Sequence, residues 1–158
     1  MANPTYTPVM GIIQNIVPLS SSCCDQLLTL VTPEGIVTFT VSKNTYIANN
    51  LQLRGGMRVT AFYDADLPVP LIFPPRYQAE VVTVLSRNET AVLQYFDENL
   101  LAADGSLQLN LGPVSTITSA NGQRFTCSPG GNLLLVYYNT VTRSIPPQTT
   151  PHKILVFC

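Results

Sequence analysis

The sequence contains one arrangement of residues twice, and this repeat constrains the fold more than any other feature. Gly55-Gly56 precedes an apolar segment that ends in two aromatic residues, and Gly130-Gly131 precedes a second segment of the same kind. A loop with a proline pair follows in both halves, Pro74-Pro75 in the first and Pro146-Pro147 in the second. Self-similarity at a period of about 70–75 residues is typical of duplicated domains.

The repeat predicts where the domains begin and end. We expect an N-terminal extension over residues 1–8, a first domain over residues 9–85 and a second domain, a repeat of the first, over residues 86–158. The predicted boundary lies at Ser86-Arg87-Asn88-Glu89, a run of four polar residues between two apolar segments. Polar segments are where few contacts cross from one domain to the next.

Strand signals dominate both halves, because β-branched and aromatic runs recur between Gly, Pro and Asn residues. Thr38–Val41 alternates polar and apolar residues, as a half-buried strand does. Pro33-Glu34-Gly35 predicts a hairpin turn. Thr45–Leu53 has room for one short helical turn. The strands expected in the first half are Val9–Val17, Gln26–Thr32, Gly35–Val41, Met57–Tyr63 and Gln78–Leu85.

These strands predict an all-β protein of two tandem small five-stranded OB-like β-barrel domains. A longer connection between the third and fourth strands favours a small, partly open barrel of this type. An immunoglobulin-like sandwich needs about seven strands and more residues per domain. The stretch Leu51–Val59 also looks like the entry into the fourth strand of an OB-like domain.

The second half resembles a known module. Leu135-Val136-Tyr137-Tyr138, followed by Thr142-Arg143-Ser144-Ile145-Pro146-Pro147-Gln148, is similar to tandem OB-like β-barrel modules of Firmicute cell-surface and spore-associated proteins. The match covers roughly residues 130–157 and, more faintly, 56–85. The first half departs from the pattern, because Leu67–Ile72 replaces the Thr-Arg-Ser-Ile core. The resemblance implies a fold and a surface location rather than a particular activity.

Few charges distinguish this chain from most globular proteins. Only 11% of its 158 residues are charged, 46% are hydrophobic, and the formal net charge is −1. A net charge near zero favours association of like molecules. Eight basic residues against nine acidic ones, without a tryptophan, give no basic groove with stacking aromatics for a nucleic acid. We therefore expect the chain to be its own partner, as a homopolymer.

The four cysteines are candidate cross-links: Cys23, Cys24, Cys127 and Cys158. Adjacent cysteines rarely pair with each other without backbone strain, so Cys23 and Cys24 favour two different partners in the same chain or in another copy. The vicinal pair is expected in an accessible loop around Ser20–Ser22. Two alternatives stay open, namely four reduced thiols in a cytosolic protein and, less favoured because the ligand spacing is wrong, a metal site.

No constellation of residues predicts an enzyme. The single histidine, His152, would have to serve any nucleophile–histidine–acid triad, and no G-x-S-x-G segment accompanies it. We expect a solvated loop histidine. Asp64-Ala65-Asp66 lacks the spacing of a calcium loop, and the acidic residues at strand ends are expected to be turn carboxylates. No catalytic residue, metal or cofactor is therefore predicted.

The ends of the chain predict a location. Met1–Pro8 has neither a basic region nor an apolar core, so we expect no secretory signal. No apolar run approaches the roughly 20 residues that span a bilayer, so no membrane insertion is expected. The expected location is extracellular or on a spore surface, reached without a signal peptide, and the alternative is the cytoplasm.

The proline-rich loops and the N-terminal tail are candidate assembly contacts. Leu71, Ile72 and Phe73 would be an unusual apolar loop tip to leave in water. The alternative interpretation is a rigid loop that protects a sheet edge. Tyr6 lies in a tail that has room to pair with a neighbouring copy as an added strand.

Two functions follow from these features. The first is a structural, self-assembling subunit of an extracellular or spore-surface filament or coat, stabilised by disulfides between subunits. The alternative is an OB-like binding module for a carbohydrate or another surface ligand, since OB-like barrels commonly bind oligosaccharides. A hydrolase has no candidate machinery in the sequence.

Overall fold

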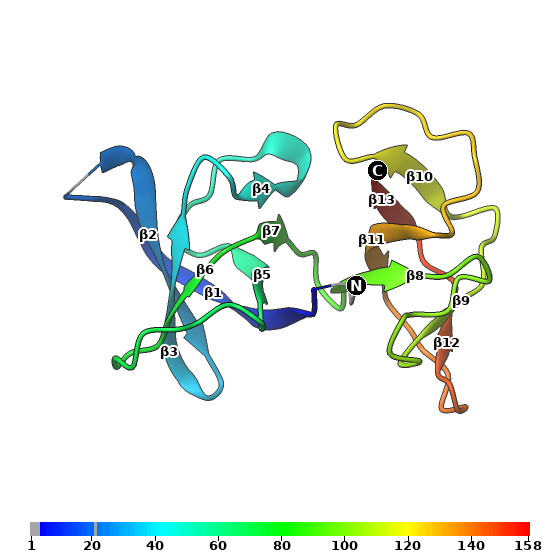
Figure 1. The fold of residues 1–158 in the computed structure, drawn as a ribbon, viewed down its shortest axis with the longest axis horizontal. Helices are drawn as coiled ribbons and strands as arrows, with labels where there is room; N and C mark the ends of the chain where they lie inside the picture. The colour runs from blue at the N-terminus through cyan, green and yellow to red at the C-terminus, as the bar shows by residue number, and fades with distance from the viewer. Residues whose placement is uncertain (1–3, 21) are drawn as a thin grey trace. The chain divides into compact units, whose positions relative to one another are not determined.

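The structure is a computed structural model that describes residues 4–20 and 22–158. The protein is all-β, and the only helical element within those ranges is the 3-10 turn η1 (Ala48–Asn50). The expected short turn within Thr45–Leu53 is thereby confirmed. The chain divides into two compact units, Met1–Ser86 and Arg87–Cys158 (Figure 1).

The first unit contains one seven-stranded sheet with the order β4-β7-β5-β1-β2-β3-β6. Neighbouring strands are antiparallel except for the pairs β3–β6 and β4–β7, which are parallel. The sheet ends at β4 and β6 and is not closed by a further pair. Its strands are β1 (Tyr6–Leu19), β2 (Ser22–Thr32), β3 (Gly35–Val41), β4 (Tyr46–Ile47), β5 (Arg58–Asp64), β6 (Arg76–Gln78) and β7 (Val81–Val84).

The second unit contains a four-stranded sheet with the order β10-β13-β11-β8 and a parallel pair of short strands, β12 and β9. Within the larger sheet only β10 and β13 are parallel. Its strands are β8 (Thr90–Phe96), β9 (Gln108–Leu109), β10 (Thr116–Ser119), β11 (Asn132–Tyr138), β12 (Gln148–Thr149) and β13 (Lys153–Phe157).

Each strand pair of the second unit has a counterpart in the first unit. In each unit the strand after the Gly-Gly pair lies between the first and the last long strand, antiparallel to both. The parallel pair β9–β12 matches β3–β6, and β10–β13 matches β4–β7. In place of β2, the second unit has only the single bridges Phe96–Ala102 and Leu101–Gln108. The second unit is a shortened version of the same strand order.

The Gly-Gly pairs have equivalent geometry in the two units. The backbone N–H of Gly56 donates to the carbonyl oxygen of Ile13 at 2.8 Å, and that of Gly131 donates to Phe96 at 2.8 Å. Their φ angles are +91° and +79°, in the region that favours glycine. The second glycine of each pair thus supplies a positive φ at the entry to the strand.

Three of the expected strands were wrong by more than one residue. The strand expected over Gln26–Thr32 begins at Ser22, which pairs with Leu19 of β1. The first strand begins at Tyr6 and not at Val9, because Tyr6, Thr7 and Pro8 pair with β5. The expected extension therefore has no free segment over residues 6–8, and its residues 1–3 lie outside the described residues. The expected strand Gln78–Leu85 is two strands, because the Ala79 N–H donates to Thr40 of β3 whereas the Glu80 N–H donates to Phe62 of β5.

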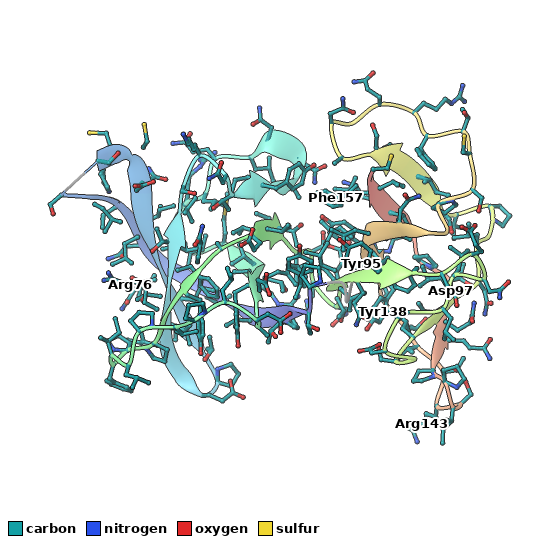
Figure 2. All side chains as sticks on the ribbon, in the orientation of Figure 1. Arg76, Tyr95, Asp97, Tyr138, Arg143 and Phe157 are labelled. Atoms are coloured by element: carbon teal, nitrogen blue, oxygen red, sulfur yellow. The ribbon has the colours of Figure 1, made fainter. Side chains whose placement is uncertain are left out.

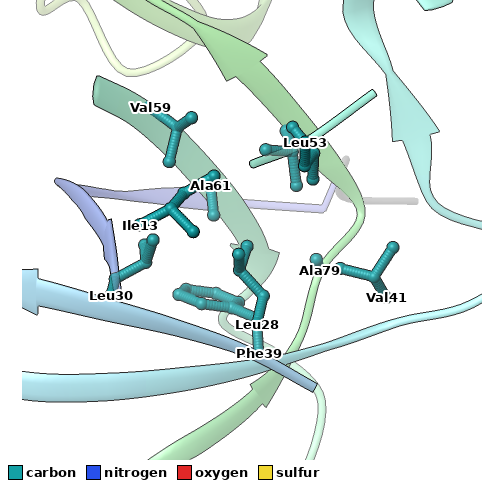
Figure 3. Close-up of a cluster of buried hydrophobic side chains, with 10 residues drawn as sticks. Ile13, Leu28, Leu30, Phe39, Val41, Leu53, Val59, Ala61 and Ala79 are labelled. Atoms are coloured by element: carbon teal, nitrogen blue, oxygen red, sulfur yellow. The ribbon is translucent and has the colours of Figure 1, made fainter. Parts of the chain in front are cut away.

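The core of the first unit is built by alternate residues of its long strands (Figure 3). Leu28 and Leu30 of β2 are fully buried, as are Val59 and Ala61 of β5. Phe39 of β3 packs in the same cluster. Burial of each large apolar side chain contributes about 1.5–3 kcal/mol, so this cluster is a main source of stability for the first unit.

The second unit has its own core, in which Leu134 and Val136 of β11 take the places of Val59 and Ala61. Ile154 and Val156 of β13 complete it with Phe96 of β8. Among the described residues, no helix is long and apolar enough to cross a membrane.

Candidate functional site

Two proline-rich loops occupy equivalent places in the units, between β5 and β6 and between β11 and β12. Each has a cis peptide bond before the first proline of its pair, at Phe73-Pro74 and at Ile145-Pro146. The carbonyl oxygen of the second proline accepts from the N–H of Thr38 at 2.8 Å in one unit and from that of Gln108 at 2.9 Å in the other. The loops are therefore anchored in the same way.

Both loops carry large apolar side chains at their tips. Leu71 is fully exposed, Phe73 is 93% exposed and Ile145 is 99% exposed. Ile72 is half exposed. Single exposed apolar residues are common on protein surfaces, but a contiguous apolar tip is typical of an interaction site.

A cavity of about 210 Å³ lies in the first unit under the base of the β5–β6 loop. Strands β3, β5 and β6 supply its polar and aromatic wall, and Leu67–Pro70 supplies its apolar rim. The polar and aromatic residues are Thr40, Tyr63, Asp64, Arg76, Tyr77 and Gln78. Concave sites with an apolar lining and a few polar groups are typical binding sites.

Aromatic rings form the floor of this cavity. The rings of Tyr63 and Tyr77 stack with centroids 4.0 Å apart and planes 13° apart, and Phe39 lies 5.7 Å from Tyr77. Burial, followed by the neighbouring Tyr77, raises the pKa of Tyr63 above its ordinary value. The raised pKa keeps the Tyr63 hydroxyl protonated and uncharged at physiological pH.

Charged groups flank the floor. The Nε of Arg76 (Figure 2) is buried and has no hydrogen-bond partner among the described residues. An unpaired buried donor costs about 1–3 kcal/mol of stability. Asp64 accepts from the Asp66 N–H at 2.9 Å, and burial followed by Asp64 raises the pKa of Glu80. This end of the unit is therefore acidic apart from Arg76.

The equivalent place in the second unit has no such groups. By strand register, Gln148 stands where Arg76 stands, and Thr149 stands where Tyr77 stands. A cavity of about 260 Å³ is lined there by Asn, Thr, Val and Gln side chains. Asn110 Nδ2 donates to Gln148 Oε1 at 2.9 Å, and Thr149 Oγ1 donates to the Thr140 carbonyl at 2.5 Å. The second unit therefore satisfies its polar groups internally.

The second loop is also ordered from within. Thr142 Oγ1 and Ser144 Oγ lie 2.6 Å apart, and Ser144 Oγ donates to the Pro146 carbonyl at 2.8 Å. The Gln148 N–H donates to Thr142 Oγ1 at 2.9 Å. These bonds fix the backbone that presents Ile145, and Arg143 is exposed beside it (Figure 2).

The four cysteines are all free and exposed. Cys23 and Cys24 lie in β2 and not in a loop, which corrects the expectation for the Ser20–Ser22 segment, of which Ser21 lies outside the described residues. The register of β1 and β2 shifts between the pairs Pro18–Gln26 and Leu19–Ser22, so both cysteines stand in an irregular part of the strand. Pairing within the chain is therefore not observed for any of the four.

His152 lies in a loop, as expected, and its side chain is 36% exposed, but it also has a specific partner. Its Nε2 lies 2.5 Å from Oε2 of Glu89, whose residue is buried. The reason is the sheet order: His152 precedes β13 and Glu89 precedes β8, and both strands flank the same end of β11.

The acidic residues at strand ends act as turn carboxylates, as expected. Asp97 Oδ1 accepts from the N–H groups of Asn99 and Leu101, and Asp104 Oδ1 accepts from the Ser106 N–H at 3.0 Å. Within residues 4–20 and 22–158, no cluster of three or more His, Cys, Asp or Glu side chains is placed to hold a metal ion.

The expected assembly residues are distributed unevenly. Leu71, Ile72 and Phe73 lie together on one exposed tip, whereas Tyr6 lies in β1 opposite Asp64. Sequence reasoning missed Ile145. The sequence contains a pattern that indicates it: an apolar residue precedes the proline pair in both loops, Phe73-Pro74-Pro75 in the first and Ile145-Pro146-Pro147 in the second.

Comparison with known proteins adds no family: no protein-family model matches the chain, and no curated protein matches it.

Proposed function

We propose that this protein is a structural subunit that self-assembles into a filament or coat through its proline-rich loops. The observation that carries the proposal is the exposure of Leu71, Phe73 and Ile145 at equivalent loop tips. Burying such side chains against another copy removes apolar surface from water at roughly 25 cal/mol per Å². With a formal net charge of −1, the chain offers little electrostatic repulsion to a second copy.

We further propose that each unit is a partly open barrel of the OB type. The strand order of the first unit supports this, because β6 and β7 are nearly continuous and pair with β3 on one side and β5 on the other. An open edge leaves backbone groups that a neighbouring copy can contact. The matching strand pairs of the second unit support a tandem duplication of this module.

Disulfides between copies are part of the proposal. All four thiols are exposed and so accessible to a neighbour. Such bonds form in oxidising surroundings, which fits the predicted extracellular or spore-surface location. Disulfides between these thiols would strengthen an assembly whose first contacts are made by the loops.

The test is light scattering of loop-tip variants. Leu71→Ser with Phe73→Ser is expected to weaken association by about tenfold or more, because buried aromatic anchors dominate interfaces. Val114→Ser is the matched control, since Val114 is exposed and apolar but lies outside both loops. Equal association of the tip variant and the wild type would exclude these loops as contacts.

A second candidate function is a carbohydrate-binding module, and the stacked Tyr63 and Tyr77 beside Arg76 favour it. Sugar rings pack on aromatic faces while charged and amide groups bind the hydroxyls. Quenching of tyrosine fluorescence by N-acetylglucosamine oligosaccharides, lost in Tyr77→Ala, would support this function. Unchanged fluorescence at millimolar oligosaccharide would exclude this sugar.

A further inference from the structure

The first unit has a cavity with an aromatic floor, and the second unit has an exposed apolar loop tip. We infer that the Ile145 tip of one copy docks into the Tyr63–Tyr77 cavity of another copy, which joins subunits head to tail. The inference rests on the proposed self-assembly and names the contact that produces it.

Shape and apolar character give the first argument. Ile145 projects from its loop at 99% exposure, and the cavity of about 210 Å³ has room for one such side chain. The stacked rings supply an apolar floor, and Leu67–Pro70 supplies an apolar rim. An exposed apolar anchor that enters a preformed pocket is the usual centre of a protein–protein interface.

Charge gives the second argument. Arg143 is exposed two residues before Ile145, while Asp64 lines the cavity with Glu80 beside it. An arginine pairs well with a carboxylate because its planar guanidinium presents two parallel donors. Arg76 also lines the cavity and adds a positive charge to its wall.

The contrast between the units gives the third argument. The second unit pairs the polar groups of its equivalent cavity with one another, as in the Asn110–Gln148 bond, and orders its loop through Thr142 and Ser144. Its loop is thus preorganised to be a ligand, which reduces the entropy lost on binding. The cavity of the first unit instead has a stacked aromatic floor and a charged wall, which suit it to be the receptor. Two unlike surfaces of this kind produce a heterologous contact, which extends to a filament when it does not close a ring.

Mixing two variants of the full-length chain tests the inference. The tip variant carries Arg143→Ser and Ile145→Ser, and the cavity variant carries Asp64→Lys. Each alone should sediment as a monomer at a concentration at which the wild type associates. Their equimolar mixture should form a 1:1 dimer and nothing larger, because each variant keeps the half that the other lacks.

Charge reversal within one chain gives an independent readout. Asp64→Lys and Arg143→Asp should each weaken association by about tenfold or more, and the double variant should recover most of the loss. Asp104→Lys is the matched control for Asp64, because Asp104 also caps a turn, and Arg124→Asp is the control for Arg143. Both controls should associate as the wild type does.

The outcomes separate the two proposals. If the wild type assembles but either variant assembles equally well alone, or the mixture stays monomeric, the docking contact is wrong and self-assembly stands. If the wild type is a monomer at every concentration, both proposals fail. If the mixture stays monomeric and N-acetylglucosamine oligosaccharides quench the tyrosine fluorescence, the cavity binds a sugar and the docking contact is wrong.

Discussion

The ring of Tyr63 on β5 stacks on the ring of Tyr77 on β6 with a centroid separation of 4.0 Å. The two strands do not lie next to each other in the sheet order, which places β6 beside β3. The stack therefore ties the end strand of the sheet back to its middle, beneath the β5–β6 loop.

Removal of this stack should loosen the first unit. Tyr77→Ala is expected to destabilise it by about 2 kcal/mol, because the packing of one aromatic pair is lost and a gap remains. Tyr77→Phe keeps both rings and should cost less than half as much. Urea unfolding followed by circular dichroism measures both changes. Equal stability of Tyr77→Ala and Tyr77→Phe would contradict a structural role for the stack.

A second prediction concerns Glu80 and pH. Burial, with a smaller contribution from Asp64, raises the pKa of Glu80 above 4.5. Its protonated form is thus favoured in the folded state, so its contribution to stability is present at low pH and is lost as pH rises through the folded pKa.

Glu80→Gln should therefore raise the melting temperature at pH 7 relative to the wild type and should change it little at pH 4. Thermal unfolding at both values checks this. Glu34→Gln is the control, because Glu34 is exposed in a hairpin turn. If Glu80→Gln lowered the melting temperature at pH 7, the ionised Glu80 side chain would stabilise the fold, and the predicted effect of its raised pKa would be wrong.

The third prediction concerns Thr60 of β5. Its Oγ1 is buried and has no hydrogen-bond partner among the described residues, and the residue is 1% exposed. Thr60→Val has nearly the same shape and removes the unsatisfied group, so it should stabilise the protein by about 1 kcal/mol. Chemical denaturation measures the gain. A loss of stability would indicate that the hydroxyl makes a bond in solution.

The fourth prediction concerns the cysteines. Non-reducing electrophoresis of protein assembled in air should show a ladder that collapses on reduction to one band near 17.2 kDa. Cys158→Ser should shorten the ladder, because one exposed thiol is removed. A single band without reductant, with four free thiols by mass spectrometry, would rule out covalent links.

Local patterns in the sequence were enough to find most strands. The strand Gly35–Val41 is found with its expected bounds, and Asn132–Tyr138 follows its Gly-Gly pair as expected. Alternation and turn residues act over a few positions, so they can be read without knowledge of the fold. The repeat of two proline loops is visible for the same reason.

The cavity could not be predicted in this way. It depends on the parallel pairing of β3 with β6, which brings Thr40 beside Gln78 across a long separation in the chain. The contact of His152 with Glu89 likewise depends on two strands that flank β11. The sequence pattern around each of these residues is compatible with several spatial neighbours. Only the order of the strands in the sheet determines which neighbour each residue has.

The most direct test of the account is the mass of the wild-type protein as a function of concentration, measured by sedimentation equilibrium with reductant present. Self-assembly through the loops predicts a weight-average mass that rises above 17.2 kDa with concentration and that falls back in the Ile145→Ser variant. A mass of 17.2 kDa for the wild type at every concentration would contradict the account.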